Sequence, residues 1–128
     1  MQFNGEERGL ALTVRGLSAL SALCPDGKIE RLGDVFDGID SGDPARVAAA
    51  VDGIAGMVAV MSECYEKRRA NETGEPMREP ITVEQVLDMD LGSVSTLAPE
   101  ITDAAAGALN TEVRTKAKKR QAAGKAAH

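Results

Sequence analysis

The sequence predicts a small, mainly α-helical domain, and three observations lead to this fold class. Aromatic residues make up only 2% of the chain, whereas sandwiches and barrels are rich in aromatic and β-branched residues. A long segment beginning near residue 43 repeats its apolar residues at helical spacing. Shorter segments on both sides begin with residues that cap helices. The length of 128 residues suits one domain, whose core must be built from aliphatic residues, methionine and alanine.

The strongest prediction is a helix that begins at residue 43. Asp43 is a favourable N-cap, and Pro44 occupies the first helical position, where its missing N–H costs no hydrogen bond. The apolar residues that follow recur every three or four positions: Val47, Val51, Ile54, Val58, Met61 and Tyr65. Alanines and glycines beside this stripe would let two helices pack closely against it. The cations at 67–69 are predicted to end the helix, since positive charge stabilises a helix C-terminus.

Two helices are predicted before this central one. Thr13 is expected to cap a helix over residues 13–23, and the Pro-Asp-Gly sequence at 25–27 would stop it. A shorter helix is predicted over 28–36. The following segment, 37–42, reads as a loop.

After the central helix, residues 71–80 contain one glycine and two prolines and are predicted to form the longest internal loop. Thr82 and Gln85 have the spacing of a capping box, in which each side chain bonds to the backbone of the other residue. A helix over 83–89 is therefore expected. The last predicted helix covers 99–109.

The N-terminus carries a signal for a β-hairpin. Asn4-Gly5 is the strongest two-residue hairpin turn, because both residues tolerate positive φ. Leu10, Leu12 and Val14 then alternate with smaller or polar residues, as in a strand. The alternative is a loop that runs directly into the first helix.

Charge divides the chain into an acidic body and a basic end. The chain has a net charge of −5, but residues 111–128 hold six cations and one anion, which leaves −10 for residues 1–110. We predict a folded domain over 1–110 and a disordered tail over 111–128. The tail is either a solubilising coil or a partner-binding arm, and the cations considered for binding are Lys116, Lys118, Lys119, Arg120 and Lys125.

Catalytic, metal and cofactor sites are not expected. The single histidine is His128, the last residue, so no Ser-His or Cys-His pair can be assembled in a pocket. Cys24 and Cys64 lie too far apart in sequence for a zinc motif. The carboxylates near 37–43 lack the calcium-loop pattern, and the glycines lack the spacing of a phosphate-binding loop. We therefore predict that the protein is not an enzyme.

Location and membrane association follow from the same patterns. Residues 1–10 are polar and acidic, so no signal peptide is expected, and the predicted compartment is the cytoplasm. The apolar run at 47–61 is interrupted and is predicted to be too short for a membrane span.

Two roles remain open for the apolar stripe of the central helix. It is either the core of a single domain or, in part, a surface that faces another protein or a second copy of the chain. The methionines would give such a surface adaptable contacts. The residues considered for protein binding are Val47, Val51, Ile54, Met57, Val58 and Met61.

Several short patterns together suggest a family. They are the Phe3-Asn4-Gly5 turn with Leu10 and Leu12, a first helix over 17–23, the long helix over 43–65, the Ile-Thr-Val-Glu-Gln-Val helix start at 81–86, a last helix over 97–109, and an Ala/Lys-rich end. This arrangement resembles the tail assembly chaperones of long-tailed, siphovirus-type bacteriophages.

The resemblance implies a protein made in the host cytoplasm and absent from the finished virion. It would bind the tape measure protein, keep its apolar helices soluble and help to recruit tail tube subunits, and it would form homo-oligomers. It also implies a programmed frameshift, at Lys118-Lys119 or preferably at Gly124-Lys125, that yields a longer product. The alternative function is a structural or adaptor subunit of a phage tail or head–tail connector. Nucleic-acid binding is disfavoured, because base stacking needs aromatic side chains.

Overall fold

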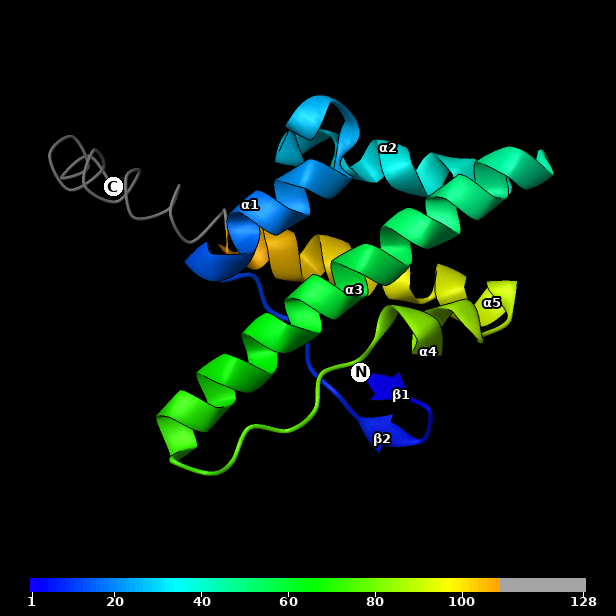
Figure 1. The fold of residues 1–128 in the computed structure, drawn as a ribbon. Helices are drawn as coiled ribbons and strands as arrows, with labels where there is room; N and C mark the ends of the chain where they lie inside the picture. Colours follow the sequence, from blue (N-terminus) through cyan, green and yellow to red (C-terminus); the bar gives the residue numbers. More distant parts are fainter. Residues whose placement is uncertain (109–128) are drawn as a thin grey trace, which may run out of the picture.

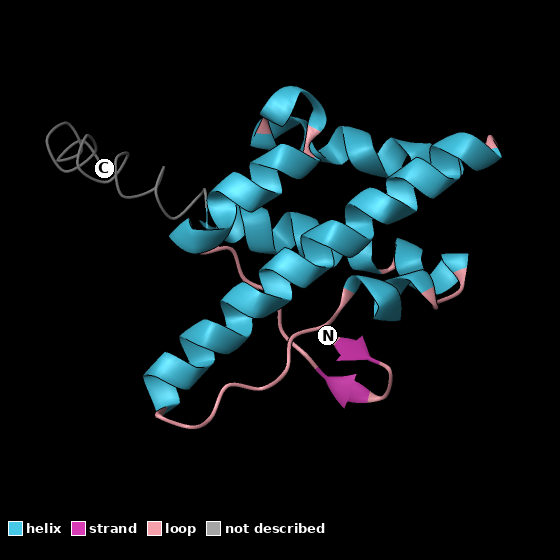
Figure 2. Cartoon of the chain, viewed as in Figure 1, coloured by secondary structure: helices cyan, strands magenta, loops and turns pink. Residues whose placement is uncertain are grey.

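The fold is organised around one long helix, α3, which runs diagonally across the body (Figure 1). The computed structural model describes residues 1–108. Helix α1 and the short helical segments after it pack against α3 on one side, and α4 packs against it elsewhere along its length. Helices account for most of the described residues, and a two-stranded antiparallel sheet lies at the N-terminus (Figure 2). The predicted mainly α class is confirmed.

The elements follow one another through short connections. In chain order they are β1 (Gln2–Phe3), β2 (Glu6–Glu7), α1 (Val14–Leu23), η1 (Pro25–Gly27), η2 (Ile29–Arg31), α2 (Leu32–Phe36), η3 (Asp37–Asp40), α3 (Pro44–Thr73), α4 (Val83–Leu87) and α5 (Leu91–Ser95), where η marks a 3-10 helix. A further helical segment covers 97–108.

Helix α3 begins as predicted but ends later. The Asp43 carboxylate accepts a hydrogen bond from the Ala45 N–H at 3.1 Å, and Pro44 is the first helical residue. The helix does not stop at the cations of 67–69, because these side chains form ion pairs with glutamates at 63, 72 and 75. It ends at Gly74, whose left-handed backbone (φ 75°) lets its N–H bond to the Ala70 carbonyl.

Glycines on α3 let neighbouring elements pack closely, as the flanking pattern predicted. A Cβ added at Gly56 would lie 3.1 Å from the Leu23 side chain of α1, and one added at Gly53 would lie 2.8 Å from Val35 of α2. Gly16 of α1 faces the Cys64 thiol of α3 in the same way. Helices therefore meet at these points with little side chain between them.

The N-terminal hairpin is confirmed. Asn4 and Gly5 both have positive φ and connect β1 to β2, which pair antiparallel with Phe3 opposite Glu6. The strand-like alternation at 10–14 does not form a strand. Leu10 and Leu12 lie in an extended connection, and Val14 begins α1. Thr13 occupies the N-cap position of α1, but its side chain makes no capping hydrogen bond.

The segment between α1 and α3 differs from the prediction. Instead of one helix over 28–36 and a loop, it forms two 3-10 turns, α2 and then η3 (Asp37–Asp40). Gly38 explains the extra helical turn: it is buried so close to α3 that an added Cβ would lie 2.8 Å from the Arg46 carbonyl oxygen. The Ser41 hydroxyl donates a hydrogen bond to the Gly38 carbonyl at 2.7 Å and closes the turn.

The C-terminal helices are more numerous than predicted. The capping box of α4 is present: the Thr82 hydroxyl accepts from the Gln85 N–H, and the Gln85 side chain accepts from the Thr82 N–H. The separate helix α5 was not predicted, and the last helix begins at residue 97 rather than 99. Pro99 fits its first turn, where a missing N–H is tolerated.

The core is aliphatic and methionine-rich, as the composition predicted. Phe3 is the only aromatic residue among the buried ones in the described part of the chain. The largest buried apolar side chains are Leu20, Ile54, Met57, Val58, Met61, Ile81, Val86, Val94 and Ile101. They come from α1, α3, α4, α5, 97–108 and, for Ile81, the connection before α4, so one core joins the helices of residues 1–108.

Helix α3 is long and apolar enough to cross a membrane, by length and composition alone. The sequence prediction treated its apolar run as too short for a span, and the observed helix of 30 residues removes that argument. A core helix of a water-soluble protein has the same properties, and 44% of its most apolar window is buried within this fold. The length and apolar composition of α3 are therefore weak evidence for a membrane span.

The predicted tail at 111–128, with its five candidate binding cations, lies outside the described residues, as do the two predicted frameshift positions.

Candidate protein-binding surface

The structure does not place the predicted binding residues of α3 on one surface. Ile54, Met57, Val58 and Met61 are fully buried within a single chain, so they form the core and are not open to a partner. Val47 and Val51 are half-buried. The four buried residues therefore have the core role, which is one of the two roles that the sequence leaves open for this stripe. The physical reason is that α3 is covered by α1 and η3 along part of its length and by α4 along another part.

Exposed large apolar side chains are concentrated in another part of the sequence. Among the described residues, five large hydrophobic side chains are exposed, and four of them lie between residues 77 and 91. They are Met77 (39% exposed), Val83 (38%), Leu87 (41%) and Leu91 (45%). We call Val83, Leu87 and Leu91 the α4–α5 strip. Clustered exposed hydrophobics are typical of protein-binding sites, whereas single ones are ordinary.

Helix α4 positions the first two members of the strip. Val83 and Leu87 are four residues apart and are therefore neighbours on one face of the helix. Val86, three residues after Val83, lies at the edge of this face and is completely buried in the core. The capping box fixes the start of this short helix, which would be marginal in isolation. The result is an apolar pair held on a rigid element.

Helix α5 positions the third member. Its N-cap is Asp90, whose carboxylate accepts hydrogen bonds from the Ser93 hydroxyl at 2.7 Å and the Ser93 N–H at 3.1 Å. The same hydroxyl and N–H lower the pKa of Asp90, so this exposed carboxylate stays ionised well below neutral pH. Val94 anchors the helix in the core. Leu91 is thus presented at the first turn of a capped helix.

Three contacts hold the segment that leads into α4. The Ile81 N–H donates to the buried Ser62 hydroxyl of α3 at 2.8 Å. The Arg8 guanidinium donates from Nη2 to the Glu79 carbonyl oxygen at 2.6 Å. Arg78 pairs with Glu6 of the hairpin. The segment at 74–82 is therefore attached both to α3 and to the N-terminus, and these attachments set where the α4–α5 strip lies.

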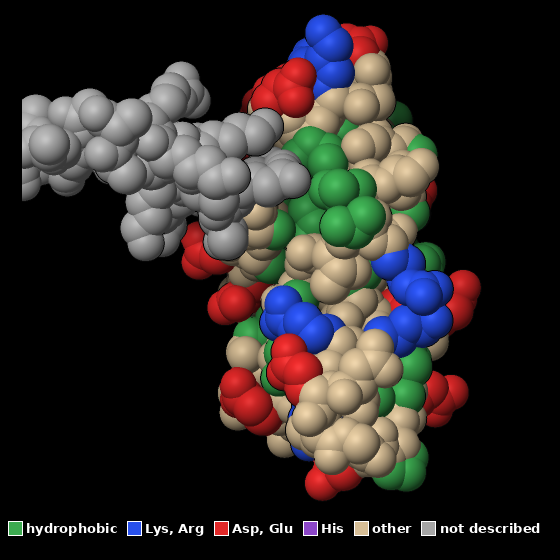
Figure 3. Space-filling model, turned by 90° about the vertical axis from the view of Figure 1, so that its left-hand side faces the viewer, with side chains coloured by type: hydrophobic (Ala, Val, Ile, Leu, Met, Phe, Trp, Pro, Cys, Tyr) green, Lys and Arg blue, Asp and Glu red, His purple; other side chains and the backbone are tan. Residues whose placement is uncertain are grey.

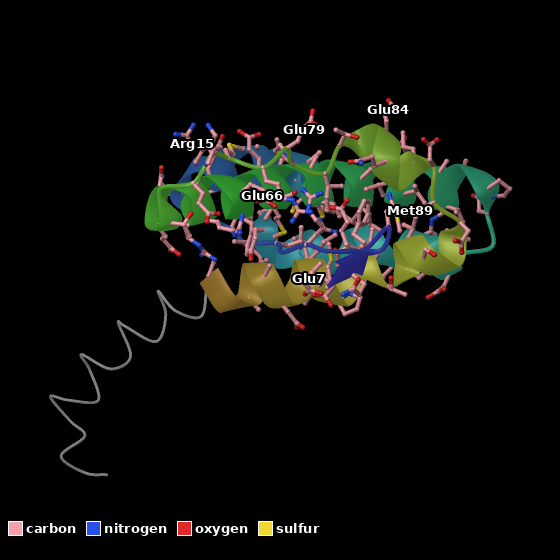
Figure 4. All side chains as sticks on the ribbon, turned by 90° about the horizontal axis from the view of Figure 1, so that it is seen from below. Glu7, Arg15, Glu66, Glu79, Glu84 and Met89 are labelled. Carbon is pink, nitrogen blue, oxygen red and sulfur yellow. The ribbon has the colours of Figure 1, made fainter. Side chains whose placement is uncertain are left out.

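A buried ion pair lies under this segment. Glu66 is 1% exposed and Arg8 is 8% exposed, and Arg8 Nη2 lies 3.5 Å from Glu66 Oε2. Arg8 Nε and Glu66 Oε1 have no hydrogen-bond partner. Figure 4 shows Glu66 in the interior, whereas Glu84 projects outward from α4. Because burying two charges is costly, we interpret the pair as a positioning contact between the N-terminus and α3.

The cavities offer little for catalysis. The one beside Arg8 has a volume of about 460 Å³ and is lined by Glu6, Arg8, Arg78, Glu79, Pro80, Thr82 and Gln85. Another, of about 370 Å³, adjoins Cys24. Burial, and then the negative charge of Glu30, raise the pKa of the Cys24 thiol, so it is a poor nucleophile. Within residues 1–108, no three side chains of the metal-binding types come together.

Val14, the fifth exposed hydrophobic residue, has a different setting. It is 86% exposed at the start of α1, on the opposite side of the body from α5 (Figure 1). The cleft beside it is lined by Arg15, Lys67, Arg68 and Glu72, among others. Figure 3, viewed from the side where α1 begins, shows hydrophobic side chains with both acidic and basic groups around them. This face therefore has no single charge.

Comparisons with protein-family models, curated proteins and solved structures find no significant match to the chain. The site is therefore assigned from its geometry. The sequence signal for it is weak, because Val83, Val86 and Leu87 have the i, i+3, i+4 spacing of a core-facing helical stripe, although only Val86 is buried.

Proposed function

We propose that this protein is a tail assembly chaperone of a long-tailed bacteriophage, which binds the tape measure protein and keeps it soluble during assembly. The observation that supports this most is the α4–α5 strip, an exposed apolar surface on a capped helical scaffold. The family resemblance of the sequence supplies the identity of the client. In this proposal the protein is not an enzyme, needs no cofactor and works in the host cytoplasm.

The size of the strip suits reversible binding. Complete burial of a valine or leucine side chain contributes about 1.5–3 kcal/mol, and the three strip residues are already more than half buried. One chain would therefore bind a client segment weakly. Several copies bound along a long client would together bind it tightly. Each copy could still dissociate separately when tail tube subunits arrive. This is the sense in which we propose a homo-oligomeric assembly on the client.

A longer product of the same gene is part of the proposal. A frameshift near Gly124-Lys125 would keep the folded body and add a domain that recruits tail tube protein. An antibody against the body should then detect a minor, longer band when the native locus is expressed.

The competing function is a structural or adaptor subunit that remains in the particle, and mass spectrometry distinguishes the two. Peptides of this chain should be abundant in lysates of producing cells and absent from purified particles, since a chaperone leaves when assembly ends. The tail tube protein serves as the positive control in both samples. Stoichiometric recovery of this chain from intact particles would favour the structural subunit and contradict the chaperone.

A further inference from the structure

The α4–α5 strip lies in a stretch of sequence whose charged side chains are all acidic. Residues 79–108 contain no lysine and no arginine. They contain six acidic residues, all of which are exposed: Glu79, Glu84, Asp88, Asp90, Glu100 and Asp103. The α1 face, in contrast, mixes both signs. Arg78, which adjoins Thr82 and Gln85 at the start of α4, is already paired with Glu6. An apolar strip whose nearby unpaired charges are acidic selects its partners by charge as well as by shape.

On α4 the acidic border runs parallel to the apolar row. Glu84 and Asp88 each follow a strip residue by one position, and consecutive helix residues are about 100° apart. The carboxylate row therefore lies along one flank of the Val83–Leu87 row. Neither carboxylate forms an ion pair within residues 1–108, and Glu84 projects away from the body (Figure 4). Both are free to meet a cation from outside.

We propose that the α4–α5 strip recognises a basic amphipathic helix, that is, a helix with one apolar face flanked by lysine or arginine. This inference rests on the proposed chaperone function and names the chemistry of the client segment. An amphipathic helix presents apolar side chains every three or four residues, which matches the Val83–Leu87 spacing. Its flanking cations would pair with Glu84 and Asp88, whereas an acidic helix would be repelled. Phosphate backbones would be repelled for the same reason.

Charge and composition favour a separate client over the two internal candidates. The basic segment at 111–128 of this chain has no large apolar residue after Val113, so it could neutralise the border but could not fill the strip. In a second copy of the chain, Lys67 and Arg68 of the α1 face already pair with glutamates at 63 and 72, and among the described cations of this face only Arg15 has no ion pair. Among the described residues of α1, Val14 is the only exposed large hydrophobic side chain, so this face offers no apolar row to fill the strip. A client with unpaired cations beside an apolar face matches the surface better.

The test uses the full chain and two synthetic helical peptides with the same apolar face. One peptide carries lysines on its flanks and the other carries glutamates, and binding is measured by fluorescence anisotropy at low salt and at high salt. Exposed ion pairs contribute up to about 1 kcal/mol each, so we expect the basic peptide to bind about tenfold more tightly. High salt should remove most of this preference.

Charge-reversal variants show which carboxylates cause the preference for the basic peptide. Glu84→Lys/Asp88→Lys should invert the preference for the basic peptide, whereas Glu30→Lys/Asp37→Lys, which changes the net charge equally in η2 and η3, should leave it intact. Equal binding of both peptides, or the same loss in both variants, would overturn the inference. It would leave the chaperone proposal standing, because absence from the particle is measured separately.

Two further results would reassign the occupant and overturn the inference. In one, the basic peptide binds only after Lys116, Lys118, Lys119, Arg120 and Lys125 are replaced by Gln, which would identify the chain's own basic end as the occupant. In the other, sedimentation shows an oligomer that Glu84→Lys/Asp88→Lys converts to monomer, which would identify a second copy. We expect neither.

Discussion

Replacing Ile54 with aspartate is expected to unfold the domain. Ile54 has no exposed surface and lies at the centre of α3, where an ionised carboxylate would have no partner. Burying such a group costs several kcal/mol, which is comparable with the total stability of about 5–15 kcal/mol that is usual for a domain. The far-ultraviolet circular dichroism signal of helix should be largely lost at room temperature.

Two further aspartate variants on the same helix serve as controls for Ile54→Asp. Ala48→Asp introduces the same charge at an exposed position and should melt close to the wild type. Val51→Asp, at a half-buried position, should lie between the two. If Ile54→Asp melts within a degree or two of the wild type, α3 is not the centre of the core.

Removing one partner of the buried ion pair is expected to cost more than removing both. Glu66→Met leaves the Arg8 guanidinium buried with only its weaker partners, and we expect a loss of about 3 kcal/mol. In Arg8→Met/Glu66→Met no uncompensated charge remains, so part of that loss should be recovered. Urea unfolding of the wild type, both single variants and the double variant measures the coupling between the two residues.

The same variants test whether the pair positions the segment before α4. If it does, Arg8→Met should also expose the backbone amides around Ile81 to hydrogen exchange, because the Glu79 carbonyl loses its donor. Additive losses in the double variant, with unchanged exchange, would show that the pair has no such role.

The parts of the fold that local chemistry determines could be predicted from the sequence. Asp43-Pro44, Thr82 with Gln85, and Asn4-Gly5 each act through their own backbone neighbours, and the structure has the two caps and the hairpin turn where these residues place them. The predictions are wrong where tertiary contacts determine the local structure. Gly38 forms part of η3 because α3 lies against it, and no local pattern contains that contact.

The end of α3 illustrates a second kind of error. Three consecutive cations were interpreted as a terminal signal, but Lys67 and Arg68 pair with glutamates four residues away within the helix, and Arg69 pairs with Glu75 beyond its end. Gly74, five residues later, is the real stop. A left-handed backbone at glycine is the stronger signal of the two, because it changes the direction of the chain whereas charge contributes only tenths of a kcal/mol.

The α4–α5 strip was not predicted, because the apolar stripe of α3 is the strongest apolar pattern in the sequence. The structure packs partners around this helix, which takes the best apolar residues into the core. The exposed surface comes instead from α4 and α5, whose five-residue helices are too short to show a clear hydrophobic period. Val83, Val86 and Leu87 have the spacing of a core-facing stripe, so the local pattern does not show which of them stays exposed.

Co-expression with the proposed client, a tape measure protein encoded in the same genome, tests the central claim most directly. We expect the wild-type chain to keep this client in the soluble fraction, and Val83→Ser/Leu87→Ser, which removes apolar surface from the α4–α5 strip, to leave most of it insoluble. Val14→Ser, which changes an equally apolar and more exposed residue outside the strip, should behave as the wild type. A client that stays insoluble with the wild type, or stays equally soluble with the strip variant, would contradict the account.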